Sequence, residues 1–117
     1  MRVAGFGFRK AAGIDSFRSA LALTGSDVAA LATVDSKLAG LTGLAVELGV
    51  PVIGVSVQEM AELDLPGSAR VKKFYGTGSV AEASALMAAG PGARLVVSKV
   101  KSADGMAVAA IAEGPGR

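Results

Sequence analysis

The sequence predicts a single three-layer α/β/α domain, in which helices cover both faces of a mostly parallel sheet of about five strands. Apolar runs of strand length alternate along the chain with segments whose apolar residues recur at helical spacing. The runs contain few polar residues, as expected of strands that are buried on both faces. A chain of 117 residues is long enough for one domain, for which we predict residues 1–113, followed by a loose tail at 114–117.

The chain opens with an apolar strand that gives way to a loop at residues 5–10. This loop contains two alternating glycines, Gly5 and Gly7, which allow the backbone to turn sharply or to approach a ligand closely. It ends in two adjacent cations, Arg9 and Lys10. In open α/β sheets, ligands bind beyond the carboxyl ends of the strands, so the loop is a candidate anion site. The alternative is a strand-to-helix turn with two solvated charges.

Helix and strand patterns then alternate. Apolar residues at helical spacing predict a helix from Ile14 to Gly25, with Asp15 or Ser16 near its start. The continuous apolar run at 28–34 predicts a second buried strand.

A second helix follows the polar segment 35–37 and ends at Gly49. Its predicted buried stripe consists of Leu38, Leu41, Ala45 and Leu48. A third buried strand is predicted at 51–55, where the proline is tolerated at the strand start.

The second half of the chain continues with helices and closes with a hairpin. A capping-box sequence at 79–82 opens an alanine-rich helix that ends at the Gly90-Pro91-Gly92 sequence. Asp104-Gly105 predicts a hairpin turn between two strands. Right-handed crossovers allow the first strand to lie at the centre of the sheet, with this hairpin at one edge. The remaining predictions are a short helix at 58–63, a turn at 65–68, a helical turn or short strand at 70–74, and strands at 95–97 and 106–111.

Composition excludes several classes of function. The chain has no Cys and no His, so we predict no disulfide, no metal site, no cofactor and no Ser-His-Asp triad. A net charge of +2 with a single tyrosine and no tryptophan argues against a nucleic-acid partner. The first apolar stretch is broken early by cations, and no uncharged run near the middle has the ~20 residues of a membrane span. We therefore expect a cytoplasmic protein with no membrane partner.

Three segments are expected to meet at the carboxyl edge of the sheet, namely 5–10, 35–37 and 76–79. Each offers groups that bind anions: backbone N–H groups freed by glycine, a helix N-terminus, hydroxyls and cations. Lys99 lies one step along a strand face beyond Val97 and is expected at the same edge. The candidate binding residues are Gly5, Gly7, Phe8, Arg9, Lys10, Asp35, Ser36, Lys37, Gly76, Thr77, Gly78, Ser79, Glu82 and Lys99.

Each segment also has a purely structural interpretation. Lys10 stands where the dinucleotide fingerprint requires a third glycine. Asp35 is a possible helix cap, and Ser79 with Glu82 satisfies a helix start by itself. Phe8 is as compatible with the core as with a ligand. The cations Arg70, Lys72, Lys73 and Lys101 are expected to be solvated charges on the surface.

Taken together, the segments 5–10, 32–37 and 76–83, with Lys99, resemble the CobE family, small cobalamin-biosynthesis proteins similar to the C-terminal domain of CbiG. The resemblance covers nearly the whole chain in the same order. It aligns the family's Gly-x-Gly-x-Arg-Arg/Lys loop with residues 5–10 and its Ser-Val-Ala-Glu helix start with 79–82. CbiG opens the lactone of cobalt-precorrin-5A and releases acetaldehyde. This chain corresponds to its C-terminal module, so membership implies no enzyme activity of the chain by itself.

The resemblance implies a role in cobalamin biosynthesis as a module that binds a corrin-pathway tetrapyrrole, with other enzymes of the pathway as possible partners. A tetrapyrrole intermediate carries several carboxylates, which separated cationic and N–H donors are suited to hold. Two alternatives remain open. One is a stand-alone hydrolase that opens a precorrin lactone with Glu82, Asp35 or a lysine as its base. The other is a nucleotide- or phosphate-binding domain.

Overall fold

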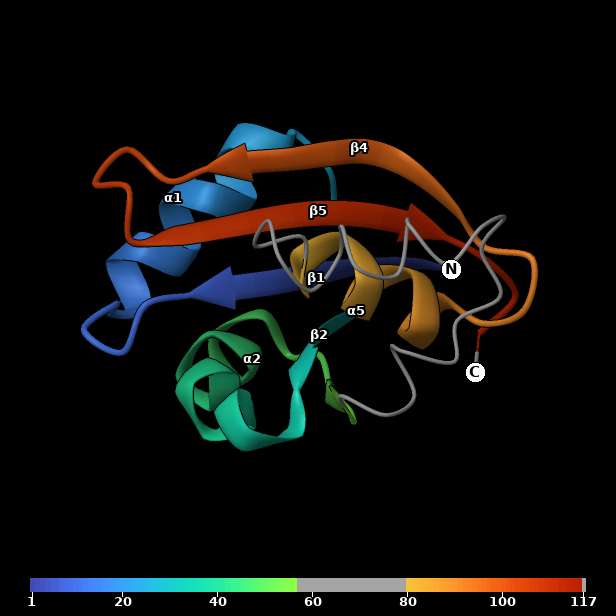
Figure 1. Ribbon diagram of the computed structural model, residues 1–117, viewed down its shortest axis with the longest axis horizontal. Coiled ribbons are helices and arrows are strands. Elements are labelled where there is room, and N and C mark those ends of the chain that lie inside the picture. The colour runs from blue at the N-terminus through green and yellow to red at the C-terminus, as the bar shows by residue number, and fades with distance from the viewer. Residues whose placement is uncertain (57–79, 117) are drawn as a thin grey trace.

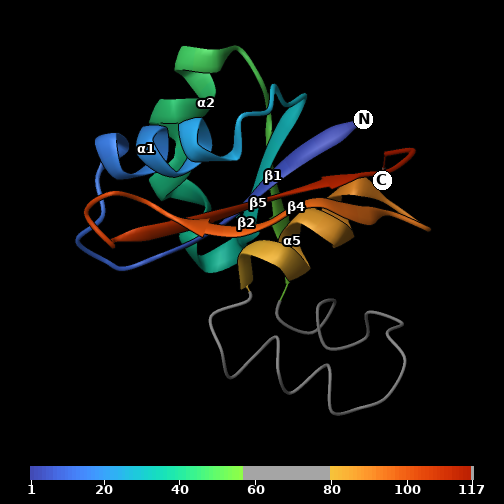
Figure 2. The ribbon, with the colours of Figure 1, turned by 90° about the horizontal axis from the view of Figure 1, so that it is seen from above.

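Helices cover both faces of a five-stranded sheet, which confirms the predicted three layers. The computed structural model of the protein describes residues 1–56 and 80–116. In chain order, the elements are β1 (Arg2–Phe8), α1 (Ile14–Thr24), β2 (Ala30–Val34), the 3-10 helix η1 (Asp35–Leu41), α2 (Thr42–Leu48), β3 (Val52–Val55), α5 (Val80–Ala89), β4 (Arg94–Lys101) and β5 (Ala107–Glu113). Figure 2 shows α1 and α2 on one face of the sheet and α5 on the other. The elements predicted at 58–63, 65–68 and 70–74 lie outside the described residues.

The strands lie in the order β3-β2-β1-β5-β4. β1 is parallel to β2 and β2 is parallel to β3, whereas β5 is antiparallel to both β1 and β4. Among the described strands, β5 therefore runs against the direction of the other four. Figure 1 shows the arrowheads of β1 and β4 at the same end of the sheet. The mostly parallel sheet, the central first strand and the hairpin at one edge are all as predicted.

The face of the sheet under α1 and α2 carries the larger core side chains. Phe6 and Leu31 project from β1 and β2, and both are fully buried. Phe17 of α1 packs edge-to-face on Phe6, with the ring centroids 5.9 Å apart. Leu44 of α2 completes this layer at 1% exposure. Alternate residues of the strands point to opposite faces, so Phe6 and Gly5 belong to different layers.

The opposite face of the sheet is packed against α5 by small side chains. The buried residues of α5 are Ala81, Ala83, Ser84, Ala85, Ala88 and Ala89. Because alanine adds little bulk, the helix backbone approaches β1 closely at Gly5. A Cβ built on Gly5 would overlap the carbonyl oxygen of Ala81 and would stand 2.6 Å from the backbone nitrogen of Ala85. Gly5 is therefore the residue of β1 against which the backbone of α5 packs directly.

This packing corrects the prediction of a loop at 5–10. β1 continues through Phe8, and Gly5 and Gly7 both lie within the strand. Gly5 pairs with Ala32 on one side and with Ala110 on the other. The absence of a side chain at Gly5 thus makes room for the backbone of α5, not for a ligand.

The prediction for the second helix also needs correction. The helix predicted at 38–48 is divided into η1 and α2, and Leu48 of its predicted stripe is 42% exposed. Asp15 and Ser16 lie in the first turn of α1, near its start as predicted; Gly13 is the N-cap residue, and no side-chain hydrogen bond caps the helix there. Near the C-terminus, the Gly116 N–H donates a hydrogen bond to the Ala89 carbonyl oxygen at 2.8 Å.

The predicted helix ends are confirmed. Gly25 and Gly49 adopt left-handed conformations with φ of 68° and 69°, immediately after α1 and α2. α5 ends before Gly90, whose φ is 102°. Such values favour glycine, because a Cβ makes the left-handed region costly.

Candidate functional site

A cleft of about 670 Å³ opens at the edge of the sheet where β1, β2 and β4 end. Its described wall includes Gly7 and Phe8 from the end of β1, Val34 from β2 and Val80 from the start of α5. Residues 105–108, in the turn before β5 and at the start of that strand, also line the cleft. The carboxyl ends of parallel strands meet there, which is where ligands bind in open α/β sheets.

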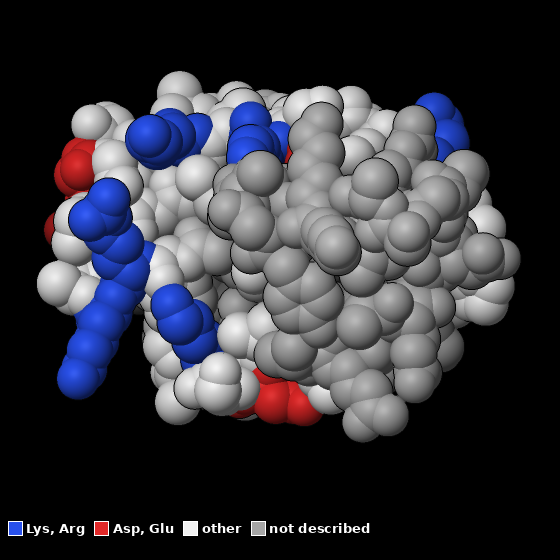
Figure 3. Space-filling model, in the orientation of Figure 1, with Lys and Arg blue, Asp and Glu red and all other residues white. Residues whose placement is uncertain are grey.

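The charged residues that line this cleft are cations. Arg9 follows β1, Lys37 lies in η1, and Lys99 and Lys101 project from β4. All four are exposed. Figure 3 shows Lys and Arg side chains gathered on the side of this face where, in Figure 1, β1 and β4 end. No Asp or Glu is among the described lining residues, so this part of the cleft is suited to an anion.

Lys37 connects the end of β1 to η1. Its ammonium group donates a hydrogen bond to the Phe8 carbonyl oxygen and lies 5.0 Å from the centroid of the Phe8 ring. The second contact is a cation–π interaction. Phe8 also packs edge-to-face on Phe17, with the centroids 4.7 Å apart. Lys37 and Phe8 are thus held in place between the core and the cleft.

Gly40 makes room for the Phe8 ring. A Cβ on Gly40 would stand 2.9 Å from two carbons of that ring. The half-buried ring of Phe8 therefore contacts η1 on one side and the cleft on the other. Phe8 serves as both a core residue and a cleft residue, although the sequence presented these roles as alternatives.

The two carboxylates proposed from sequence lie outside the described cleft lining. The Glu82 carboxylate accepts a hydrogen bond from the backbone N–H of Lys99 at 3.2 Å, which connects α5 to β4. Asp35 packs over β3, where a Cβ on Gly54 would stand 3.4 Å from the Asp35 Cγ. Each side chain thus contacts an edge strand of the described sheet, β4 for Glu82 and β3 for Asp35.

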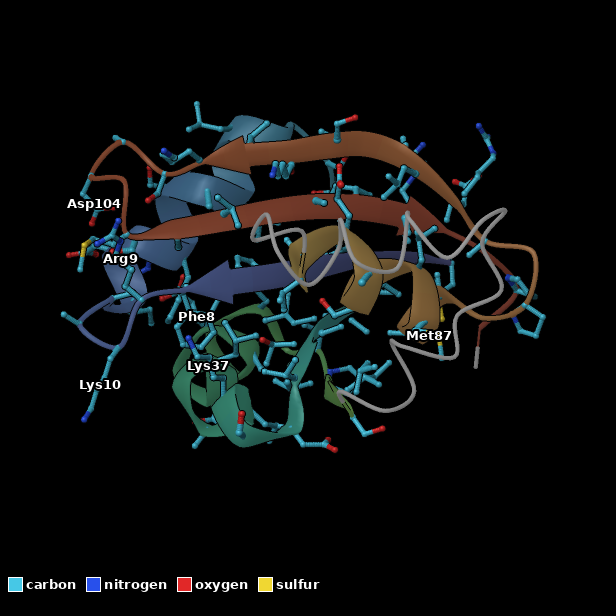
Figure 4. All side chains as sticks on the ribbon, in the orientation of Figure 1. Phe8, Arg9, Lys10, Lys37, Met87 and Asp104 are labelled. Atoms are coloured by element: carbon cyan, nitrogen blue, oxygen red, sulfur yellow. The ribbon has the colours of Figure 1, made fainter. Side chains whose placement is uncertain are left out.

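Five of the candidate residues line the cleft together: Gly7, Phe8, Arg9, Lys37 and Lys99. Another five do not line it: Gly5, Lys10, Asp35, Ser36 and Glu82. Figure 4 shows Lys10 extending away from the sheet, on the other side of the chain from Arg9. The candidates Gly76, Thr77, Gly78 and Ser79 lie outside the described residues.

Lys101 and Met106 also line the cleft, although neither was predicted as a binding residue. Lys101 was interpreted as a solvated charge, yet it lies two residues after Lys99 in β4 and lines the same cleft. The period-two alternation of a strand was the available signal, because it places both lysines on one face. No such alternation points to Met106. Its carbonyl accepts a hydrogen bond from the Arg9 N–H at 2.9 Å.

Within residues 1–56 and 80–116, no group of three or more acidic side chains is arranged to hold a metal ion. The helices in that part of the chain are too short to cross a membrane.

Comparison with known proteins connects this chain to cobalamin biosynthesis. The family described as cobalamin synthesis G C-terminus matches residues 2–112. No curated protein matches the chain.

The solved structures similar to the chain include three proteins named for cobalamin biosynthesis. CobE, from the cobalamin (vitamin B12) biosynthetic pathway, is 29% identical over 100% of this chain and 92% of that chain, with a TM-score of 0.74. Cobalamin biosynthesis protein chiG from Agrobacterium tumefaciens str. C58 is 31% identical over 97% of this chain and 98% of its own, with a TM-score of 0.68. A cobalamin biosynthesis protein G homologue from Sulfolobus solfataricus shares the fold at 19% identity and a TM-score of 0.73, over 99% of this chain and 37% of its own.

Proposed function

The chain belongs to the family described as cobalamin synthesis G C-terminus, and we propose that it binds a tetrapyrrole polycarboxylate intermediate of that pathway. Its family places it in cobalamin biosynthesis. The proposed role is to hold or hand on an intermediate for the enzymes of the pathway. The proposed binding site is the cleft at the carboxyl edge of the sheet.

The observation that carries this proposal is the set of separated cations around one cleft. Arg9 follows β1, Lys37 lies in η1, and Lys99 and Lys101 lie in β4, yet all four line the same space. A tetrapyrrole intermediate has carboxylates spread around a ring, so it needs several separated donors rather than one concentrated anion site. Arginine holds a carboxylate with two parallel hydrogen bonds, and lysine pairs with one more loosely.

The apolar part of the cleft fits the same ligand class. Phe8, Val34, Val80 and Met106 lie between the cations and offer surface that can cover the face of a ring. The volume of about 670 Å³ is in the range of small-molecule sites, about 300–1,000 Å³. Apolar walls with a few charged groups are the usual composition of such sites.

The proposal is tested by titrating the purified chain with uroporphyrin, a tetrapyrrole with carboxylates on all its side chains, and following its absorbance. We expect saturable binding that weakens as salt is raised, because ion pairs at exposed cations are screened. Coproporphyrin, which carries fewer carboxylates, is the matched probe and is expected to bind more weakly. Binding of ATP without binding of either porphyrin would contradict the proposal and favour the nucleotide alternative.

A second prediction separates a binding module from the hydrolase alternative. We expect the chain alone to release no acetaldehyde from a lactone precorrin, because no carboxylate is among the described residues of the cleft wall. Water activation for lactone opening needs a general base within hydrogen-bonding reach of the reacting water. The two carboxylates considered as bases, Glu82 and Asp35, contact β4 and β3, at the Lys99 N–H and at Gly54. Acetaldehyde production that is lost in Glu82→Gln would establish the hydrolase instead.

A further inference from the structure

The tip of the β4–β5 hairpin is organised by one carboxylate. The Oδ1 atom of Asp104 accepts hydrogen bonds from the Ser102 hydroxyl at 2.6 Å and from the Met106 N–H at 3.0 Å. Its Oδ2 atom accepts a hydrogen bond from the hydroxyl of Ser16, at 2.5 Å. The first two bonds close the turn, and the third ties the turn to α1.

A second bond ties the same turn to the same helix. The Ala103 N–H donates to the Ser19 hydroxyl oxygen at 2.9 Å, one helical turn after Ser16. The side chains of Ser16 and Ser102 are nearly inaccessible to solvent, each residue being 4% exposed. Buried hydroxyls with definite partners fix the geometry of a turn more firmly than solvated ones. The hairpin is thus held from the face of the sheet opposite α5.

This turn also forms one wall of the cleft. Lys101 immediately precedes it, and Gly105 and Met106 line the cleft directly. The Met106 carbonyl accepts the N–H of Arg9 at 2.9 Å, so the turn is bonded to the opposite wall as well. Figure 4 shows Asp104 at the tip of the hairpin with Arg9 beside it. A displacement of this turn would therefore change the spacing between Lys101 and Arg9, two of the four cations.

We infer that Asp104 is a positioning residue for the cleft: anchored to α1, it sets where Lys101 and Met106 stand relative to Arg9. The inference rests on the proposed function for what the cleft binds. The hydrogen bonds from Ser102 and Ser16 lower the pKa of Asp104 to about 2. Its carboxylate is therefore ionised at neutral pH and acts only as an acceptor, as the three observed bonds require.

Positioning and simple electrostatics predict opposite effects on anion binding. A carboxylate near a cationic cleft repels an anionic ligand, so its removal alone would tighten binding. Loss of positioning would weaken binding instead. Asp104→Asn removes the charge but keeps an oxygen acceptor for the turn and an amide that can bond the Ser16 hydroxyl. Asp104→Ala removes both the charge and the bonds, and Ser16→Ala keeps the charge but removes the tie to α1.

The test is a uroporphyrin titration of these three variants at a temperature where all of them are folded, as checked by circular dichroism. We expect Asp104→Ala and Ser16→Ala to bind about fivefold more weakly than the wild type, the loss typical of one net hydrogen bond. Asp104→Asn is expected to bind at least as tightly as the wild type. Asp27→Ala is the matched charge control, because Asp27 is exposed before β2, at the opposite edge of the sheet. If Asp104→Ala binds as tightly as Asp104→Asn, the positioning role is wrong.

Amide hydrogen exchange tests the same inference without a ligand. In Ser16→Ala we expect the N–H groups of Arg9 and Met106 to exchange about tenfold faster than in the wild type, with the β2 amides unchanged. Wild-type exchange at both positions would overturn the inference. Failure of the wild type to bind uroporphyrin would instead refute the proposed function, and the exchange rates would still decide the role of Asp104.

Discussion

Gly5→Ala is expected to destabilise the protein by about 3 kcal/mol, at the upper end of the usual range for overpacking a core. A Cβ at this position would stand 2.6 Å from the backbone nitrogen of Ala85 and 2.8 Å from its Cβ, and would overlap the Ala81 carbonyl oxygen. These atoms belong mainly to the backbone of α5, so a change of rotamer cannot relieve the overlap. The helix must move away from β1, which opens the alanine-rich layer. Urea denaturation followed by circular dichroism measures the effect.

Gly43→Ala is the matched control. Gly43 lies in α2, and a Cβ there would meet only the Ile14 Cδ1, at an ordinary contact distance of 3.6 Å. The same substitution is expected to stabilise the protein by about 0.5–1 kcal/mol, because alanine loses less backbone entropy in a helix. The two variants therefore shift the urea midpoint in opposite directions. If the Gly5→Ala variant unfolds at the same urea concentration as Gly43→Ala, the backbone of α5 does not pack against β1 at Gly5.

The layers of the fold were predictable because each depends on local sequence. Apolar runs of strand length and helical spacings define the elements, and left-handed glycines such as Gly25 and Gly49 end the helices. Gly5 was misinterpreted because its partner is distant in the sequence. A glycine in a strand marks a close approach, but the sequence does not say whether a ligand or a helix approaches. The helix in question begins at Val80.

The candidate site was predictable at the level of segments and less so at single residues. The ends of β1 and β2 were expected to meet, and Arg9 and Lys37 line one cleft there. Adjacent residues after a strand point in different directions, so only one of Arg9 and Lys10 reaches it. Arg9 is the one that faces the cleft, because its backbone N–H is hydrogen-bonded to the Met106 carbonyl oxygen. That pairing arises from the β1–β5 ladder, whose register is not evident from either segment alone.

The division of the predicted second helix could not be foreseen from apolar spacing. The apolar spacing from Leu38 to Leu48 fits one helix, yet the chain forms η1 and then α2. Within α2, Leu44 is buried, whereas Leu48, one turn later at the end of the helix, is 42% exposed. The Phe8 ring packs against this segment, close to Gly40. A tertiary contact of this kind leaves no periodic signal in the sequence.

The largest expected effect on ligand binding comes from removing two cations of the cleft together. Arg9→Gln combined with Lys101→Gln is expected to weaken uroporphyrin binding about 100-fold, since each charge-assisted hydrogen bond contributes ~1.5 kcal/mol or more, about tenfold. The two residues come from opposite walls, after β1 and on β4, so their effects should be close to additive. Neither is buried, so the substitutions leave the core unchanged.

Lys10→Gln is the matched control, because it removes a positive charge that does not line the cleft. Lys10 is adjacent to Arg9 and carries the same charge as Lys101, but it extends away from the cleft. Its loss changes the net charge of the protein without removing a ligand contact, so binding should weaken less than about twofold. The double variant should also show a flatter dependence of affinity on salt, because fewer ion pairs remain to be screened. If Lys10→Gln weakens binding as much as Arg9→Gln does, the affinity reflects general surface charge, and the cleft is not the binding site.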